Sequence, residues 1–127
     1  MPTPQPNSCN CFVCGLANPL SLHLRFYDTA PGEVTAQTTI GEHYQGYPGV
    51  VHGGIVAAML DEAAGRAYLS GDSPRFMYTA RLEIRYRHNV PVGVPLRLVG
   101  RAGRSKARTA TATSALYLQD GALLAEA

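Results

Sequence analysis

The chain has 127 residues, of which 46% are hydrophobic and 16% are charged, and its formal net charge is +2. These values are typical of one folded domain and exclude a disordered chain or two domains. No apolar run approaches the roughly 20 residues of a membrane span, and no recognition motif accompanies the basic residues, so we expect neither membrane nor nucleic acid as a partner.

The first segment is rich in proline and lacks a basic region followed by an apolar stretch. We therefore expect residues 1–10 to be a disordered tail rather than a secretory signal, with a single domain over residues 11–127. The expected compartment is the cytoplasm.

Three cysteines follow within six residues, namely Cys9, Cys11 and Cys14. They would be candidates for a zinc site if His23 completed a set of four ligands. Because there is no second cysteine pair and the count is odd, the favoured interpretation is reduced thiols that pack at the start of a strand, with no metal.

The remaining elements are read from the hydrophobic pattern. Alternation predicts strands over residues 22–28 and 34–40, joined by a turn at Pro31-Gly32, and a loop over residues 41–49. An alanine-rich helix should run from about His52 to Leu69. The rest is β, with strands expected over residues 77–88, 96–101, 108–119 and 123–127. The order β-β-α-β-β-β-β predicts an α+β domain, in which one long helix packs on a mostly antiparallel sheet of about six strands.

The start of the helix carries the chemistry. Gly53 and Gly54 allow close approach of a ligand, and the first N–H groups of a helix have no intrahelical acceptor. Asp61 lies about two turns further along an apolar helix, where a carboxylate is costly to bury. Oxyanion donors together with a buried acid indicate acyl transfer.

A family resemblance supports this chemistry. The motif Pro48-Gly49-Val50-Val51-His52-Gly53-Gly54, followed by Asp61, resembles the acyl-CoA thioesterases of the 4-hydroxybenzoyl-CoA thioesterase superfamily, which have the hotdog fold. The PaaI-like branch is the most similar. The leader Cys11-Phe12-Val13-Cys14-Gly15, with Asn18-Pro19, Leu22 and Leu24-Arg25-Phe26, is similar to that of many bacterial members.

The resemblance implies roles for five residues. The Gly53 N–H would polarise the thioester carbonyl, and Asp61 would be the general base or the nucleophile, acting from the partner helix of a dimer. Thr79 would hold the water, Gln45 would lie near the thioester, and His52 would orient the Gly-Gly turn or the carbonyl. A structural acid at Asp61, and a Thr79 present only for its β-propensity, remain open as alternatives.

The resemblance further implies an acyl-CoA substrate, no cofactor, and a homodimer with shared sites that often pairs into a tetramer. Gly54 is expected at the substrate together with Gly53. CoA carries phosphates, which the arginine-rich C-terminal half could bind, although solvated strand faces explain those arginines as well. Arg81 and Arg85 are the candidates because they share the face of Thr79. The acyl group stays open, since the expected pocket residues Met59, Tyr68, Phe76 and Tyr78 are not placed by the pattern.

Two other functions share features with this sequence. The segment from His43 to Pro48 loosely echoes a motif of hydroxyacyl dehydratases, whose helix glutamate lies five residues after the glycine that corresponds to Gly49. That position is Gly54, which has no carboxylate. A non-catalytic acyl-CoA-binding regulator is expected to carry a pair of DNA-binding helices, which the sequence before Leu22 does not contain, and Asp61 favours an enzyme.

Overall fold

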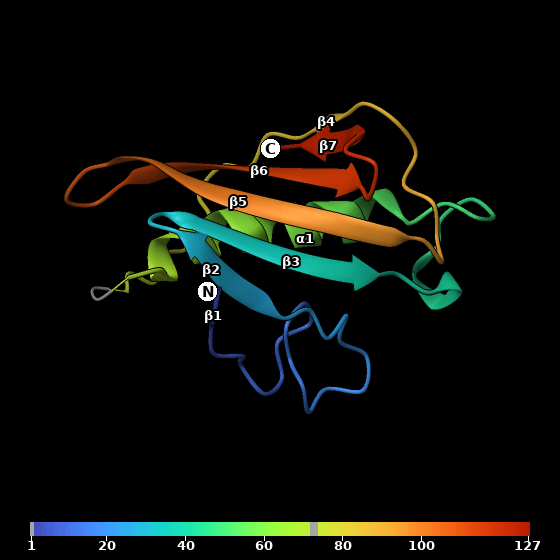
Figure 1. Ribbon diagram of the computed structural model, residues 1–127, viewed down its shortest axis with the longest axis horizontal. Coiled ribbons are helices and arrows are strands. Elements are labelled where there is room, and N and C mark those ends of the chain that lie inside the picture. The colour runs from blue at the N-terminus through green and yellow to red at the C-terminus, as the bar shows by residue number, and fades with distance from the viewer. Residues whose placement is uncertain (1, 72–73) are drawn as a thin grey trace.

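The structure is a computed structural model that describes residues 2–71 and 74–127. One long helix lies against one curved sheet (Figure 1). The helix α1 spans Gly53–Arg66 and continues as the 3-10 turn η2, Ala67–Leu69, in agreement with the predicted helix. The strands of the described chain are β1 (Thr3–Pro4), β2 (Phe26–Ala30), β3 (Glu33–Thr39), β4 (Arg85–Tyr86), β5 (Pro95–Ser105), β6 (Ala110–Leu118) and β7 (Leu123–Glu126).

The sheet has the order β1-β2-β3-β5-β6-β7-β4, and all neighbouring strands are antiparallel. The α+β prediction with one long helix is therefore confirmed, with seven strands in the described chain instead of about six. The turn predicted at residues 103–105 belongs to β5, which continues to Ser105, and the hairpin turns between Lys106 and Thr109. No helix among the described residues is long and apolar enough to cross a membrane.

The core lies between α1 and the sheet. Apolar side chains of the helix, including Met59 and Leu60, pack with Leu98 and Leu116 of the central strands. The approach is close at Gly100, because a Cβ at this position would collide with the carbonyl group of Ala63. Ser114 Oγ of β6 donates a buried hydrogen bond of 2.7 Å to the Leu60 carbonyl oxygen. These contacts fix the helix on the sheet and hence the position of its N-terminal end.

The N-terminal segment packs on the domain, whereas the sequence predicted a disordered tail over residues 1–10. Thr3 and Pro4 pair with Asp28 and Tyr27 of β2. Gln5 is buried, and its Nε2 donates to the Arg66 carbonyl oxygen at 3.1 Å. Such polar contacts compensate for the weak propensity of a proline-rich segment to form regular structure.

The first predicted strand begins later than expected. Residues 22–25 precede β2, because His23 has a left-handed backbone with φ of 56° that interrupts an extended chain. The flanking amides of Leu22 and Leu24 instead donate to the carbonyl oxygens of Phe12 and Val13, at 2.8 and 2.9 Å. This segment therefore pairs with the cysteine-containing turn and not with a strand.

Of the strand predicted over residues 77–88, only the two residues of β4 form a strand. Arg85 and Tyr86 pair with the short strand β7, and the described residues before them are assigned to no strand. The apolar face expected there is only partly covered: Leu82 and Tyr86 are 41% and 52% exposed, whereas Ile84 is half-buried against the core. The alternation required a neighbouring strand along its whole length, and the described residues supply only the four of β7.

Candidate functional site

The candidate site begins at the N-terminal end of α1. His52 caps the helix, because its Nδ1 accepts a hydrogen bond of 2.8 Å from the Gly54 N–H and its carbonyl oxygen accepts from Ile55 and Val56. None of the hydrogen bonds between described residues uses the Gly53 N–H, which is left as a donor for a ligand. Since Nδ1 is an acceptor, a neutral His52 ring carries its proton on Nε2 as a second donor.

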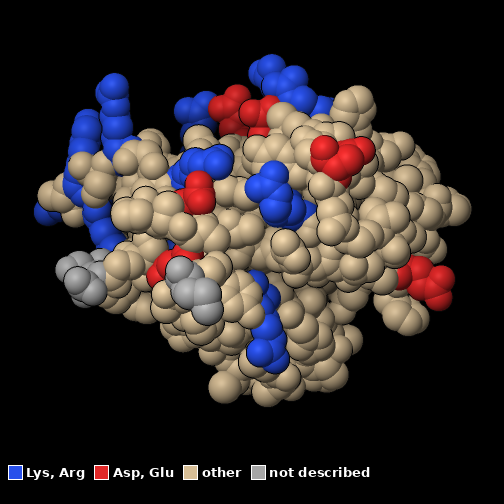
Figure 2. Space-filling model, in the orientation of Figure 1, with Lys and Arg blue, Asp and Glu red and all other residues tan. Residues whose placement is uncertain are grey.

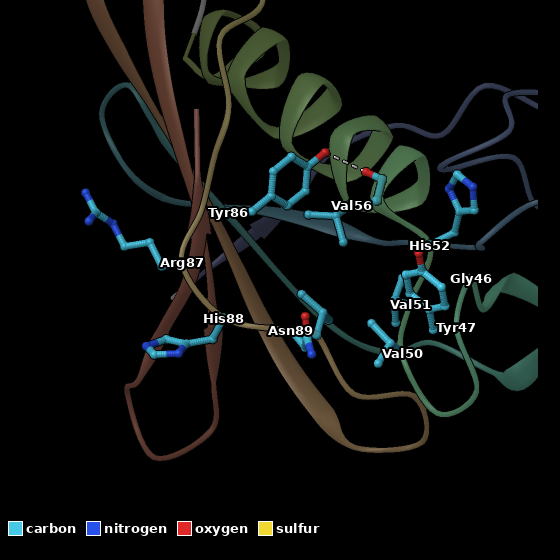
Figure 3. Close-up of a pocket in the computed structure, with 12 residues that line it drawn as sticks. Gly46, Tyr47, Val50, Val51, His52, Val56, Tyr86, Arg87, His88 and Asn89 are labelled. Carbon is cyan, nitrogen blue, oxygen red and sulfur yellow. Dashed lines mark hydrogen bonds between the residues drawn. The ribbon is translucent and has the colours of Figure 1, made fainter.

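A cavity of about 590 Å³ lies beside this helix start (Figure 3). Tyr86 of β4 forms part of its wall and donates from its hydroxyl group to the Gly53 carbonyl oxygen at 2.7 Å. Two isolated antiparallel β-bridges, Gln45–Val51 and Val50–Pro91, shape the loop that precedes the helix. The lining residues come from two segments and the first turn of α1: Gly46, Tyr47, Val50, Val51, His52, Gly53 and Val56, and Tyr86, Arg87, His88, Asn89 and Val90.

Asp61 of α1 and Thr79, from the segment before β4, form a second polar group. Thr79 Oγ1 donates to Asp61 Oδ1 at 2.6 Å, with Asp61 half-buried and Thr79 exposed. A helix rises about 1.5 Å per residue, so the offset of eight positions from Gly53 to Asp61 separates the two by about 12 Å along α1. Neither Asp61 nor Thr79 lines the cavity. Within one chain, the backbone donor and the acid therefore do not meet at one carbonyl group.

Two of the predicted substrate residues have other contacts. Gln45 Oε1 accepts from the Gly49 N–H at 3.1 Å and so holds the loop, outside the residues that line the cavity. The Gly54 N–H is already used by the His52 side chain. His52 thus contacts the Gly-Gly turn, and whether it orients this turn or the substrate carbonyl stays a prediction.

The two arginines chosen from the sequence lie away from the cavity. Arg81 is exposed and forms a loose ion pair with Glu83 at 3.8 Å, and Arg85 is exposed in β4. Arg87 lines the cavity instead, with its Nε 2.6 Å from a carboxylate oxygen of Glu126. Arg87 has the same alternation as Thr79, Arg81 and Arg85, but this pattern does not show which residue of the face lies at the cavity. His88 also lines the cavity, and no pattern in the sequence indicated this.

The expected pocket residues are dispersed. Met59 is fully buried in the core, and the Tyr68 hydroxyl donates to the Thr111 carbonyl oxygen at 2.5 Å. Phe76 and Tyr78 are 83% and 101% exposed.

The other arginines and the lysine of the C-terminal half gather mainly at one end of the molecule, where the β5–β6 hairpin projects (Figure 2). The exposed basic residues of this hairpin are Arg101, Arg104, Lys106 and Arg108.

A separate cluster involves the cysteines. The Cys11 and Cys14 sulfur atoms and the Glu62 carboxylate lie within 4.8 Å of one another. Burial raises the pKa of the Cys14 thiol to about 11, so it is protonated at neutral pH. Cys9 is exposed and outside this cluster, and His23 Nε2 lies 3.0 Å from the Asn18 carbonyl oxygen. The ligand set considered from the sequence is therefore not brought together.

A single long helix on an antiparallel sheet, with a Gly-Gly helix start beside a cavity, is the architecture of a hotdog domain. The family model described as the thioesterase superfamily matches residues 48–125, from the loop before α1 into β7. Because this match covers more than half of the chain, the chain belongs to the thioesterase superfamily.

Curated relatives are matched over a limited length. The chain is 39% identical to acyl-coenzyme A thioesterase THEM5 of Mus musculus over 54 residues, which are 42% of this chain and 21% of that protein. It is 34% identical to acyl-coenzyme A thioesterase THEM4 of Xenopus laevis over 70 residues, which are 54% of this chain and 30% of that protein. The match thus spans less than a third of the length of these relatives.

Solved structures agree over most of the chain. A thioesterase superfamily protein with a crystal structure is 31% identical, with a TM-score of 0.85 over 91% of this chain and 59% of that chain. A Streptococcus mutans UA159 protein bound to acetyl CoA has 20% identity and a TM-score of 0.73, over 81% of this chain and 82% of that one. The latter identity shows the fold alone. The hotdog fold expected from the sequence is confirmed.

Proposed function

We propose that the chain is an acyl-CoA thioesterase that hydrolyses the thioester of an acyl- or aroyl-CoA to the free acid and CoA. The observation that carries this proposal is the open Gly53 N–H at the start of α1, in the wall of the cavity. The names of the curated relatives and the acetyl CoA in the Streptococcus mutans structure support it. Membership of the PaaI-like branch, which the sequence motif suggested, is part of the same proposal.

The helix start supplies the electrophilic half of the site. The Gly53 N–H binds the thioester oxygen, aided by the positive end of the helix dipole. The His52 Nε2–H is the second donor in this proposal, because Nδ1 is committed to the cap. Charge that develops on the oxygen during attack is thereby stabilised by donors that are already oriented.

Asp61 and Thr79 supply the nucleophilic half. As a general base, Asp61 takes a proton from a water held by Thr79, and the resulting hydroxide adds to the thioester carbon. The C–S bond then breaks and the proton passes to the CoA sulfur. As a nucleophile, Asp61 would form an anhydride that water opens. A single turnover in ¹⁸O-labelled water distinguishes the two, since only the second route can introduce label into the Asp61 carboxylate.

The separation of about 12 Å between Gly53 and Asp61 requires a second subunit. Two antiparallel copies of α1 related by a two-fold axis would place Asp61 of one chain near Gly53 of its partner. The exposed side chains of Phe76, Tyr78 and Leu82 support an interface next to Thr79, since single-chain contacts leave them uncovered. The proposed assembly is a homodimer with shared sites, and pairing of two dimers is part of the same proposal.

The first experiment measures release of free thiol from a panel of acyl-CoAs. We expect hydrolysis by the natural sequence and a loss of kcat of about 100-fold or more for Asp61→Asn, because the base or nucleophile is removed. Asp120→Asn is the matched control: it makes the same chemical change in the β6–β7 turn, where an asparagine can also accept from the Ala122 N–H.

The outcome also separates the other functions. Binding of acyl-CoA without thiol release, unchanged by Asp61→Asn, would make the chain a non-catalytic binding module. Hydration of crotonyl-CoA without thiol release would make it a hydratase or dehydratase. Either result contradicts the proposal.

The second experiment tests the shared site with two inactive variants. Gly53→Pro removes the N–H donor at the first helical position, where proline is tolerated, and His52 already has the extended backbone that precedes proline (φ −56°, ψ 136°). Gly53→Ala is its control, because the new Cβ would lie 3.7–3.8 Å from Tyr86 atoms, an ordinary contact, and keeps the donor.

Mixing Gly53→Pro with Asp61→Asn after subunit exchange should restore activity. Each mixed dimer then holds one site with both defects and one with neither, so random exchange restores up to about a quarter of the natural activity. If both groups acted within one chain, every site would keep a defect and the mixture would stay inactive. Sedimentation of the exchanged sample verifies that dimers are present.

A further inference from the structure

The N-terminal turn and helix α1 bring together three groups that the proposed reaction does not use. Cys11 Sγ lies 3.7 and 3.8 Å from the two oxygens of the Glu62 carboxylate, and the Cys14 sulfur completes a group within 4.8 Å. In a tetrahedral zinc site, with Zn–S of about 2.3 Å and Zn–O of about 2.0–2.2 Å, neighbouring ligand atoms are about 3.5–3.8 Å apart. The Cys11–Glu62 separations thus match the edge of such a site.

The turn is built so that both thiols face the same way. The Cys14 N–H points to Cys11 Sγ at 3.5 Å, and the Gly15 N–H donates to the Cys11 carbonyl oxygen at 2.8 Å. A Cβ at Gly15 would collide with that carbonyl oxygen, so this tight turn requires glycine. The turn is held on the domain by the hydrogen bonds of Leu22 and Leu24.

Charge favours a divalent cation between these groups. Once metal binding has displaced the thiol protons, two thiolates and one carboxylate carry −3 and the guanidinium group of Arg66 brings +1, so one divalent cation makes the cluster neutral. Arg66 is 6% exposed; its Nη2 donates to Cys14 Sγ and its Nε to Glu62, each at 2.9 Å. Gln5 Oε1 and the Pro6 carbonyl oxygen accept from its Nη1 and fix the guanidinium group from the other side. Outer donors of this kind orient metal ligands and reduce their charge.

We propose that Cys11, Cys14 and Glu62 form a zinc-binding site that fastens the N-terminal turn to α1. Two thiolates select zinc over the harder cations Mg²⁺ and Ca²⁺. Cys11 is half-exposed, so solvent reaches the fourth position on its side and a water occupies it. The site stabilises the fold next to the helix turn that carries Asp61, and it takes no part in the hydrolysis itself.

The test uses Co²⁺ as a spectroscopic substitute for zinc. Metal-free, fully reduced protein is titrated with Co²⁺, and a sulfur-to-cobalt charge-transfer band should saturate at one equivalent and disappear when Zn²⁺ displaces the Co²⁺. Cys11→Ser and Cys14→Ser should lose the band, and Glu62→Gln should weaken Co²⁺ binding by about ten-fold or more. Cys9→Ser, an exposed cysteine outside the cluster, should titrate as the natural sequence does.

Stability provides an independent readout. Zn²⁺ should raise the thermal unfolding midpoint of the natural sequence and of Cys9→Ser, but not that of Cys11→Ser. Circular dichroism verifies that Cys11→Ser, which changes a half-exposed side chain, is folded. The proposal is overturned if no band forms with folded protein, or if the band survives in Cys11→Ser. A Cys11–Cys14 disulfide formed with peroxide in protein that binds no metal would likewise overturn it and assign the pair to redox chemistry.

Discussion

Thr79 Oγ1 donates a hydrogen bond of 2.6 Å to Asp61 Oδ1 across 18 residues of sequence. This contact joins the segment before β4 to the middle of α1, and it occupies one carboxylate oxygen while leaving the other for a proton. The hydroxyl group thus orients the acid in addition to any role in holding water. The contact lies beside the exposed aromatic residues Phe76 and Tyr78, at the surface where we propose that a second subunit binds.

Replacing Thr79 should separate orientation of the acid from folding. Thr79→Val keeps the shape and removes the hydroxyl, so we expect kcat for acyl-CoA hydrolysis to fall by about 10- to 100-fold, the size of a hydrogen bond to a charged group. Thr79→Ser keeps the donor and should retain most activity. The free energy of unfolding should change by less than about 0.5 kcal/mol, because the residue is exposed. Equal kcat values for Thr79→Val and Thr79→Ser would show that the hydroxyl is not used.

His52 combines a helix cap with the proposed contact to the substrate, and two variants distinguish these roles. His52→Ala removes the acceptor for the Gly54 N–H and should lower the free energy of unfolding by about 1 kcal/mol. His52→Asn keeps a capping acceptor but lacks Nε2, so stability should be retained while kcat/KM falls. Urea unfolding and steady-state kinetics measure the two effects. If His52→Asn keeps full kcat/KM, the histidine serves the helix alone.

Much of the fold follows from local pattern. The alanine-rich run from His52 and its glycine start predicted α1 within a few residues, because the cap and the apolar face are both local signals. The prediction of a strand over residues 77–88 was wrong for a non-local reason. Its alternation describes a surface that needs a neighbour, and the described chain offers only β7 beside Arg85 and Tyr86.

The candidate site was predictable where it depends on the helix. Spacing alone placed Gly53 and Asp61 on α1, and the family resemblance singled out Thr79 as the residue that holds the water. Its hydrogen bond to Asp61 was found only in the structure. Arg87 was missed because alternation selects a face of a strand, whereas proximity to the cavity depends on where β4 meets the start of α1 through Tyr86. Glu62 was missed as a partner of the cysteines for the same reason: that contact spans 51 residues.

Arg87 and Arg81 provide a matched test of phosphate binding. Arg87→Gln should raise the KM for acyl-CoA by about 5- to 10-fold with kcat nearly unchanged, and should make KM less sensitive to salt, since a charge near the cavity is lost. Its ion pair with Glu126 is partly exposed and contributes little to stability. Arg81→Gln, whose side chain is 87% exposed, should leave KM unchanged. The reverse order of effects would favour the arginine chosen from the sequence.

The same glycine-to-alanine change should have opposite effects at two positions. At Gly100 the new Cβ would collide with the Ala63 carbonyl group, so β5 and α1 must separate, and we expect the free energy of unfolding to fall by about 1–3 kcal/mol or more. Gly65 lies in α1. Apart from its chain neighbours and the backbone of the helix itself, no described atom lies within 4 Å of the position that an alanine methyl group would occupy, so Gly65→Ala should gain up to about 1 kcal/mol from helix propensity. Urea unfolding at one fixed protein concentration measures both, because subunit association contributes to stability.

A loss of stability in Gly65→Ala would indicate that a partner helix packs against this glycine. A Gly100→Ala variant as stable as the natural sequence would contradict the close contact between helix and sheet.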